Sequence, residues 1–247
     1  MRITVITPTY NEAENLPKLV SALFSLPLDL RILVVDDNSP DGTGQIADNL
    51  AVANPGRLDV LHQSGKMGLR LAYLNGFRKV LAESNAQAIV QMDADFSHDP
   101  SILATMEKLL AAGDLVLGSR YIPGGAVDKN WPTWRKNLSA FGNLYARTIL
   151  NVPLYDVTTG YRMWKRETLE HMPLERVQAS GYVFQVEMAY LAYCLGFNVI
   201  ETPIYFPDRQ RGKSKISFKI QSEAAFRVWQ VLWGYKDLRK AGKAGRI

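Results

Sequence analysis

Through the first half of the chain, short runs typical of strands alternate with stretches of helical spacing. Strands are expected at residues 2–7, 30–35, 58–61, 86–92 and 115–118, and helices at residues 14–24, 42–53, 68–82 and 100–111. This alternation is typical of crossover units that pair strands in parallel. The uninterrupted apolar runs ILVV and AIVQM suit strands that helices cover on both faces. We therefore predict an α/β fold with a mostly parallel central sheet flanked by helices.

Beyond residue 118 the alternation weakens, and an elaboration beside the sheet is expected. Residues 121–156 are rich in Trp, Pro and Gly. Further helices are expected at residues 134–150, 181–195 and 216–240, and short strands at residues 198–200 and 203–206. The chain of 247 residues shows no linker and no internal repeat. One domain over residues 1–235, followed by a basic tail over residues 236–247, is therefore predicted.

Composition excludes several classes of protein. Hydrophobic residues make up 47% of the chain and charged residues 21%, which argues against disorder, collagen and coiled coil. The longest stretch without a charge, residues 188–200, is shorter than the roughly 20 apolar residues that cross a bilayer. No apolar signal region precedes the first strand, and Cys194 has no second cysteine to pair with. A cytosol-facing protein is expected, with Cys194 packed as a small apolar side chain.

Positive charge is concentrated at the C-terminus. Of the net charge of +5, the last twelve residues, KDLRKAGKAGRI, contribute +4. Such a tail is either a solvated chain end or a segment attracted to an anionic surface, such as lipid headgroups or nucleic acid. A nucleic-acid-binding module is thus one alternative, but it leaves the acidic clusters of the chain unexplained.

Two acidic clusters follow strands of the predicted sheet. Asp36 and Asp37 follow ILVV, and Asp93 and Asp95 follow AIVQM. Ligands of open α/β sheets bind outside the carboxyl ends of the strands, so these aspartates are candidate functional residues. Alternate residues of an extended chain point the same way, which aims the carboxylates of Asp93 and Asp95 at one point.

A divalent cation relieves the repulsion between two such carboxylates. Hard oxygen ligands predict Mg²⁺ or Mn²⁺, with waters and substrate phosphates completing the coordination. His98 is a possible further ligand. Ser97 and the pair Asp99 and Pro100 equally fit the cap of the next helix.

Several motifs in order resemble a known family. The runs ITPTYNE, VVDDNSPDGT, MDADFSHDP and GSRY are similar to those of the inverting nucleotide-sugar glycosyltransferases of family 2, which have the GT-A fold. With GSRYIPGG, WRKNLSAFGN, TGYR and DRQRGKSK, the chain resembles more closely the dolichol-phosphate mannose synthases and their bacterial and archaeal counterparts, in the subtype without a membrane span. The resemblance covers about residues 3–215.

The resemblance implies transfer of mannose from GDP-mannose to a polyprenyl phosphate by a single GT-A catalytic domain with amphipathic helical elements toward its C-terminus. It places the D-x-D motif at Asp93, Ala94 and Asp95 and a third cation ligand at Ser97. It gives catalytic roles to Asp95, Arg120 and Arg135. For the donor nucleotide sugar it implies contacts with Pro8, Tyr10, Glu12, Asp37, Asp93, Ala94, Asp95 and Arg209.

The implied acceptor is an anionic phosphate that is already nucleophilic, so it needs cations to hold it rather than a strong base. The residues assigned to it are Arg120, Arg135, Ser139, Ser214 and Lys215. In a helix over residues 134–150, Arg135 and Ser139 would share a face.

A lipid acceptor implies contact with the cytoplasmic face of a membrane and no nucleic-acid partner. Two groups of aromatic residues offer either interfacial anchoring or packing in the core or an oligomer: Trp131, Trp134, Phe141 and Tyr145, and then Phe226, Trp229, Trp233 and Tyr235. The basic tail favours peripheral membrane association.

Other donors and other enzymes remain as alternatives. A glucosyltransferase that uses UDP-glucose would have the same D-x-D motif, because base and sugar are selected by pocket shape. A nucleotidyltransferase needs a Gly-rich, Lys-containing loop after the first strand, and ITPTYNE is not one. Arg70 stands where the family usually has a small residue, and no role is assigned to it.

Overall fold

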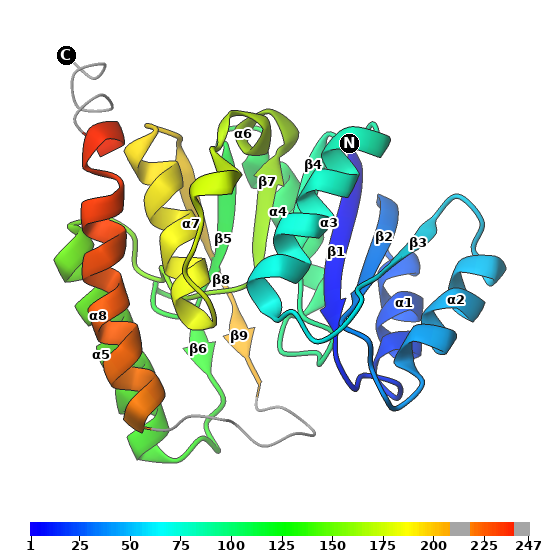
Figure 1. Ribbon diagram of the computed structural model, residues 1–247, viewed down its shortest axis with the longest axis horizontal. Coiled ribbons are helices and arrows are strands. Elements are labelled where there is room, and N and C mark those ends of the chain that lie inside the picture. Colours follow the sequence, from blue (N-terminus) through cyan, green and yellow to red (C-terminus); the bar gives the residue numbers. More distant parts are fainter. Residues whose placement is uncertain (208–217, 240–247) are drawn as a thin grey trace.

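A central sheet runs through the molecule, and helices pack on both of its faces (Figure 1). The computed structural model describes residues 1–207 and 218–239, with the side chains of residues 1–207 and 225–239. Within these residues the sheet has seven strands in the order β3-β2-β1-β4-β7-β5-β8. They are β1 (Arg2–Thr9), β2 (Asp29–Asp36), β3 (Leu58–His62), β4 (Ala88–Gln91), β5 (Leu115–Ser119), β7 (Arg162–Lys165) and β8 (Val199–Pro203).

All of these strands run parallel except β7, which is antiparallel to both of its neighbours, β4 and β5. A separate parallel pair is formed by β6 (Ala126–Val127) and β9 (Tyr205–Phe206). The predicted α/β fold with a mostly parallel central sheet is confirmed.

The helices form one layer on each face of the sheet and a further pair beside it (Figure 1). One layer holds α1 (Leu16–Phe24), α2 (Thr43–Ala53) and α4 (Leu103–Leu110), which follows the short 3₁₀ helix η1 (Pro100–Ile102). The other holds α3 (Leu69–Glu83), α6 (Arg166–His171), the 3₁₀ helix η2 (Leu174–Arg176) and α7 (Tyr182–Cys194). Beyond α7 lie α5 (Thr133–Leu150) and α8 (Phe218–Gly234), side by side.

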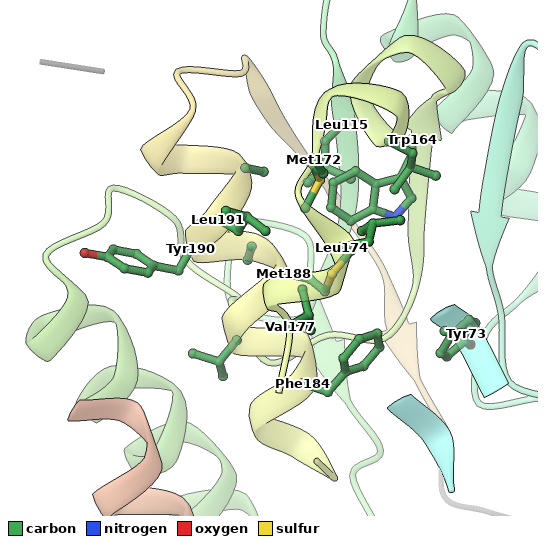
Figure 2. Close-up of a cluster of buried hydrophobic side chains, with 14 of the residues drawn as sticks. Tyr73, Leu115, Trp164, Met172, Leu174, Val177, Phe184, Met188, Tyr190 and Leu191 are labelled. Carbon is green, nitrogen blue, oxygen red and sulfur yellow. The ribbon is translucent and has the colours of Figure 1, made fainter. Parts of the chain in front are cut away.

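Alternate side chains of the central strands supply the two cores. In β5, Leu115 and Leu117 join the cluster under α3 and α7, whereas Val116 joins the cluster under α1 and α4. Burial of both faces explains why these strands read as continuous apolar runs. Figure 2 shows the larger cluster, with Phe184 and Met188 of α7 in the same group as Trp164. Each such side chain stabilises the fold by about 1.5–3 kcal/mol.

Differences from the prediction fall mainly in the second half. Strand β7, helix α6 and strand β6 were not expected, whereas the short strands expected at residues 198–200 and 203–206 correspond to β8 and β9. The expected helix at residues 100–111 is divided into η1 and α4. The expected helix at residues 216–240 breaks at a turn at Tyr235, after Gly234. Residues 216, 217 and 240 lie outside the described residues.

The C-terminal segment that the structure describes is fastened to the domain. Asp237 forms an ion pair with Arg176 at 2.8 Å, and Leu238 packs against the larger core cluster. The proposed boundary at residue 235 stays a prediction, and residues 240–247 lie outside the described residues. Among the described helices, none combines the length and apolar character needed to span a membrane.

Candidate active site

The predicted functional residues emerge at one edge of the sheet, the lower edge in Figure 1. Strand register places Ile6 of β1 level with Gln91 of β4, Gln91 level with Arg162 of β7, and Arg162 level with Leu117 of β5. Asp93 follows Gln91 by two residues and Arg120 follows Leu117 by three, so both lie just beyond the carboxyl ends of β4 and β5. The chain crosses from one side of β1 to the other between β3 and β4, so this edge contains the topological switch point at which α/β sheets bind ligands.

The end of β1 and the loop after it carry Pro8, Tyr10 and Glu12, all half-buried. The backbone N–H of Glu12 donates to Thr43 Oγ1 at 2.9 Å, which fastens this loop to the start of α2. Lys66 Nζ lies over the ring of Tyr10, 3.5 Å from its centre. The predicted nucleotide-pocket residues are therefore brought together with a cation that sequence reasoning had not assigned.

Asp37 is buried at the end of β2, and both of its oxygens accept hydrogen bonds. Gln63 Nε2 donates to Oδ1 at 2.5 Å, and the backbone N–H of Gly68 donates to Oδ2 at 2.7 Å. Gly68 precedes α3 with φ of 84°, a left-handed conformation that suits glycine. Asp37 thus fixes the start of α3 relative to β2. Its assignment to the nucleotide base stays a prediction.

Asp93 and Asp95 follow β4 and are half-buried, with Ala94 buried between them. Tyr73 of α3 donates its hydroxyl to Asp93 Oδ1 at 3.3 Å, and burial raises the pKa of Tyr73 well above its usual value, with the charge of Asp93 adding to the rise. The backbone N–H of Ser97 donates to Asp95 Oδ1 at 3.0 Å. Because its pKa is raised, the Tyr73 hydroxyl keeps its proton and remains a hydrogen-bond donor to Asp93.

Two partly accessible carboxylates in this arrangement fit a hard divalent cation. The described part of the chain contains no group of three or more His, Cys, Asp or Glu side chains that could hold a metal alone. Mg²⁺ commonly binds through one or two carboxylates together with waters and substrate phosphates. Ser97 Oγ is buried and makes no hydrogen bond within the described residues. Its predicted role as a ligand stays a prediction.

The loop after the D-x-D motif is shaped by two local features. Phe96 has φ of 61°, a conformation that costs a bulky residue of the order of 1–3 kcal/mol unless its surroundings enforce it. Asp99 accepts a hydrogen bond from the N–H of Ser101 at 2.9 Å, and Pro100 opens η1, which matches the predicted cap. His98 is buried in this loop, and its Nδ1 accepts the backbone N–H of Asp93 at 3.0 Å.

Arg120 follows β5 and is held by Asp156, a residue without a motif. Its Nε and Nη2 donate to the two carboxylate oxygens at 2.7 and 2.8 Å, and Nη2 also donates to Thr158 Oγ1 at 2.7 Å. Burial alone would lower the pKa of Arg120, but the negative charge of Asp156 outweighs it and raises the pKa above its usual value. The guanidinium is therefore fixed in its charged form. Within the described residues, the two N–H groups on Nη1 make no hydrogen bond.

Arg135 and Ser139 lie on α5, as predicted. Ser139 Oγ is 2.7 Å from the hydroxyl oxygen of Tyr121, and Arg135 lies over the ring of Trp131, 3.8 Å from its centre. Trp131 in turn packs edge-on against Phe206 at 5.8 Å between ring centres. The two residues are thus held toward the end of β5 and toward β9.

Phe206 links Arg120 and Arg135, the two arginines predicted to bind the acceptor, into one cluster. The guanidinium of Arg120 lies 5.3 Å from the centre of this ring, and His98 packs edge-on against it at 5.9 Å. Sequence reasoning missed Phe206, Asp156 and Tyr73, which lie in none of the quoted motifs, and Tyr121, which lies inside the motif GSRY. The predicted Arg209, Ser214 and Lys215 lie outside the described residues.

Exposed aromatic side chains gather on the paired helices α5 and α8, and we name them the aromatic face. It consists of Trp134, Phe141, Phe226, Trp229 and Trp233, and the exposed Leu144 lies on the same helix as the first two. Two other predicted anchors, Trp131 and Tyr235, are buried, so packing is their role. Trp229 Nε1 donates to the hydroxyl of Tyr145 at 2.9 Å, which ties α8 to α5.

The fold is that of glycosyltransferases of known structure. With a TM-score of 0.63 and 17% identity, it matches glucosyl-3-phosphoglycerate synthase of Mycobacterium tuberculosis, solved with Mn²⁺, uridine diphosphate and glucosyl-3-phosphoglycerate; the match covers 95% of this chain and 79% of that one. A mannosyltransferase of Pyrobaculum calidifontis, solved with GDP-Man and Mn²⁺, matches with a TM-score of 0.57 at 20% identity, over 98% of this chain and 75% of that one.

Sequence comparison adds the family. The chain belongs to glycosyl transferase family 2, whose model matches residues 4–172. A polyprenol monophosphomannose synthase of Mycolicibacterium smegmatis is 46% identical over 236 residues, 95% of this chain and 88% of the relative. An undecaprenyl-phosphate mannosyltransferase of Micrococcus luteus is 44% identical over 234 residues, 95% of this chain and 94% of the relative.

Proposed function

We propose that this enzyme transfers mannose from GDP-mannose to the phosphate of a polyprenyl phosphate, with inversion at the anomeric carbon. The observation that carries the proposal is the similarity to two relatives, at 46% and 44% identity, both matched over nearly their whole length. One is named a polyprenol monophosphomannose synthase and the other an undecaprenyl-phosphate mannosyltransferase. The arrangement of strand-end aspartates opposite a buried, charged arginine supports it.

On the donor side, Asp93 and Asp95 would hold Mg²⁺ or Mn²⁺, which supplies Lewis-acid neutralisation of the departing diphosphate. Pro8, Tyr10 and Glu12 line the nucleotide, and Asp37 contacts the base. Each oxygen of Asp37 accepts one hydrogen bond from the residues that the structure describes, which leaves lone pairs for a base N–H. Arg209 contributes a further cation to the donor.

On the acceptor side, the chain's task is to hold an anion in line with the sugar. A phosphate oxygen of the lipid forms the new bond to the anomeric carbon, and the bond from that carbon to GDP breaks, so no proton has to be removed by a strong base. Arg120 offers the two N–H groups on Nη1, and Arg135 and Ser139 offer donors from α5. Ser214 and Lys215 belong to the same proposed set.

The lipid tail of the acceptor places the enzyme at a membrane surface. The aromatic face continues from the helix that carries Arg135 and Ser139, so contact between this face and lipid would bring the phosphate to the acceptor residues. We therefore propose peripheral association with the cytoplasmic face of a membrane, aided by the basic tail.

A donor panel tests the proposed function. Radiolabelled GDP-mannose, UDP-glucose and UDP-galactose are each incubated with the purified enzyme and a short polyprenyl phosphate, with Mg²⁺, with Mn²⁺ or with chelator. Labelled lipid from GDP-mannose alone, lost with chelator and restored by excess cation, is expected. Label from UDP-glucose instead would replace mannose by glucose, and label that persists in chelator would remove the cation from the proposal.

A further inference from the structure

The motif TGYR, residues 159–162, has no part in the proposed binding of donor or acceptor, yet it packs directly against the loop of the D-x-D motif. Tyr161 donates its hydroxyl to the carbonyl oxygen of Asp99 at 2.8 Å. Its ring stacks on His98 with 4.8 Å between ring centres and 11° between planes. The motif therefore contacts the loop at two consecutive residues, both beyond the aspartates.

His98, which Tyr161 holds in place, is hydrogen-bonded to Asp93. The side chain is 1% exposed, and its Nδ1 accepts the backbone N–H of Asp93 at 3.0 Å. An Nδ1 that accepts carries no proton, so a neutral ring has its proton on Nε2. Because the lone pair of Nδ1 is already used, this nitrogen is not available to a cation. We therefore assign His98 to the support of the Asp93 backbone and not to the ligands of the cation.

Asp93 is held at both its backbone and its side chain. His98 fixes its N–H, and the buried hydroxyl of Tyr73 meets its carboxylate at 3.3 Å. The left-handed conformation at Phe96 shows that the loop between Asp95 and His98 needs its surroundings to keep its shape. Tyr73 comes from α3, whereas His98 lies in the same loop as Asp93 and is packed against Tyr161 of the TGYR motif.

We propose that His98 and Tyr161 are positioning residues that set the orientation of Asp93 for the divalent cation. The inference rests on the proposed function and deepens it, because it assigns the TGYR motif to the cation site as an outer support. Removing an outer support of a metal ligand usually lowers metal affinity by about 10- to 100-fold.

Three variants of the full chain test it. His98→Phe keeps a ring to stack on Tyr161 but loses the acceptor, and His98→Asn restores an acceptor near the position of Nδ1 without the ring. Tyr161→Phe removes one hydroxyl and is the gentler change if His98→Phe fails to fold. His171→Asn, at an exposed histidine of α6, is the matched control. Mn²⁺ affinity in the presence of GDP is measured by electron paramagnetic resonance, together with the KM for donor and kcat.

We expect His98→Phe to weaken Mn²⁺ binding by about tenfold or more and Tyr161→Phe to weaken it by several fold, with His98→Asn recovering most of the loss and the control unchanged. Unchanged Mn²⁺ affinity in both Phe variants overturns the inference, and so does equal loss in His98→Phe and His98→Asn. A wild type that binds no Mn²⁺ beside GDP overturns the cation of the proposed function, and the inference with it.

Discussion

Arg120 and Asp156 form a two-point ion pair in the interior, with both carboxylate oxygens accepting from one guanidinium at 2.7 and 2.8 Å. The Asp156 side chain is fully buried, and the backbone N–H of Asp156 is itself fixed by Glu201 at 2.9 Å. This pair orients an arginine at the carboxyl end of β5 before any ligand arrives. The proposed acceptor phosphate would then meet a cation whose geometry is already set.

Asp156→Ala should leave the buried charge of Arg120 without its partner, so we expect a loss of about 3–5 kcal/mol in the free energy of unfolding. Urea unfolding measures it. The double variant Arg120→Met with Asp156→Leu should recover much of that loss, because both charges are removed together. If the unfolding free energy lost in the double variant equals the sum of the losses in Arg120→Met alone and Asp156→Leu alone, the two charges do not stabilise each other and the prediction is wrong.

Asp95→Asn should lower turnover by roughly 100- to 1000-fold, a size typical for loss of one electrostatic group at a reacting centre, while thermal unfolding stays close to that of the wild type. The assay follows sugar transfer across a titration of Mn²⁺. Asp59→Asn, at an exposed aspartate of β3, serves as the control. Full turnover in Asp95→Asn would remove this residue from the cation site.

Arg135→Ala should raise the KM for the lipid phosphate by about tenfold or more, because a charge-assisted hydrogen bond contributes about 1.5–3 kcal/mol. The KM for GDP-mannose at saturating acceptor should change little. Arg78→Ala removes the same charge from an exposed position on α3 and is expected to leave both constants alone. An equal rise in both KM values for Arg135→Ala would argue for a general loss of structure.

Replacing Trp134 and Phe141 by Ser should weaken binding to vesicles of phosphatidylglycerol and phosphatidylcholine by about tenfold or more, since each large apolar side chain gains about 1.5–3 kcal/mol when fully buried. Co-sedimentation measures the bound fraction. Val52, 83% exposed on α2, supplies the control variant Val52→Ser. Equal binding by all three proteins would assign the aromatic face to another partner.

Glu187 on α7 should make stability depend on pH. Burial raises the pKa of Glu187 above its usual value, although hydrogen bonds from Ala179, Tyr235 and Gln178 act in the opposite direction. The folded state therefore holds the proton more tightly than the unfolded chain does. The resulting stabilisation is complete below the unfolded pKa, near 4.3, and is lost as the pH rises through the folded value.

The variant Glu187→Gln has no such titration, so its unfolding free energy relative to the wild type should rise between pH 4 and pH 7, on top of a constant offset from the changed hydrogen bonds. Urea unfolding at several pH values measures this difference. A difference that stays constant with pH would contradict the raised pKa.

The first half of the fold was predictable because its signals are local. Continuous apolar strands, helical spacing and strand-end aspartates each lie within a few neighbouring residues, and all of them reappear in the structure. Strand β7 gave no such signal. It begins with Arg162, a fully buried arginine whose Nε and Nη2 donate to backbone carbonyls of Thr159, Val157 and Gln185. A charged first residue and only four residues do not look like a central strand.

The site was predictable to the extent that motifs mark it. Asp93 and Arg120 stand in motifs, but their partners are chosen by the fold: Tyr73 comes from α3, and Asp156 lies 36 residues beyond Arg120. Whether the aromatic residues pack or face solvent also depended on contacts between distant segments. Trp131 is buried beside Phe206 of β9 and Tyr235 beside Tyr190 of α7, whereas Trp134 and Trp233 are exposed.

The antiparallel strand in the middle of the sheet also sets a distance. Neighbouring strands lie about 4.8 Å apart, so β4 and β5, on either side of β7, are separated by roughly 10 Å at the level of Gln91 and Leu117. Asp93 and Arg120 leave the sheet from those two strands. β7 therefore acts as a spacer: it holds the strand that leads to Asp93 and the strand that leads to Arg120 two strand spacings apart where they leave the sheet.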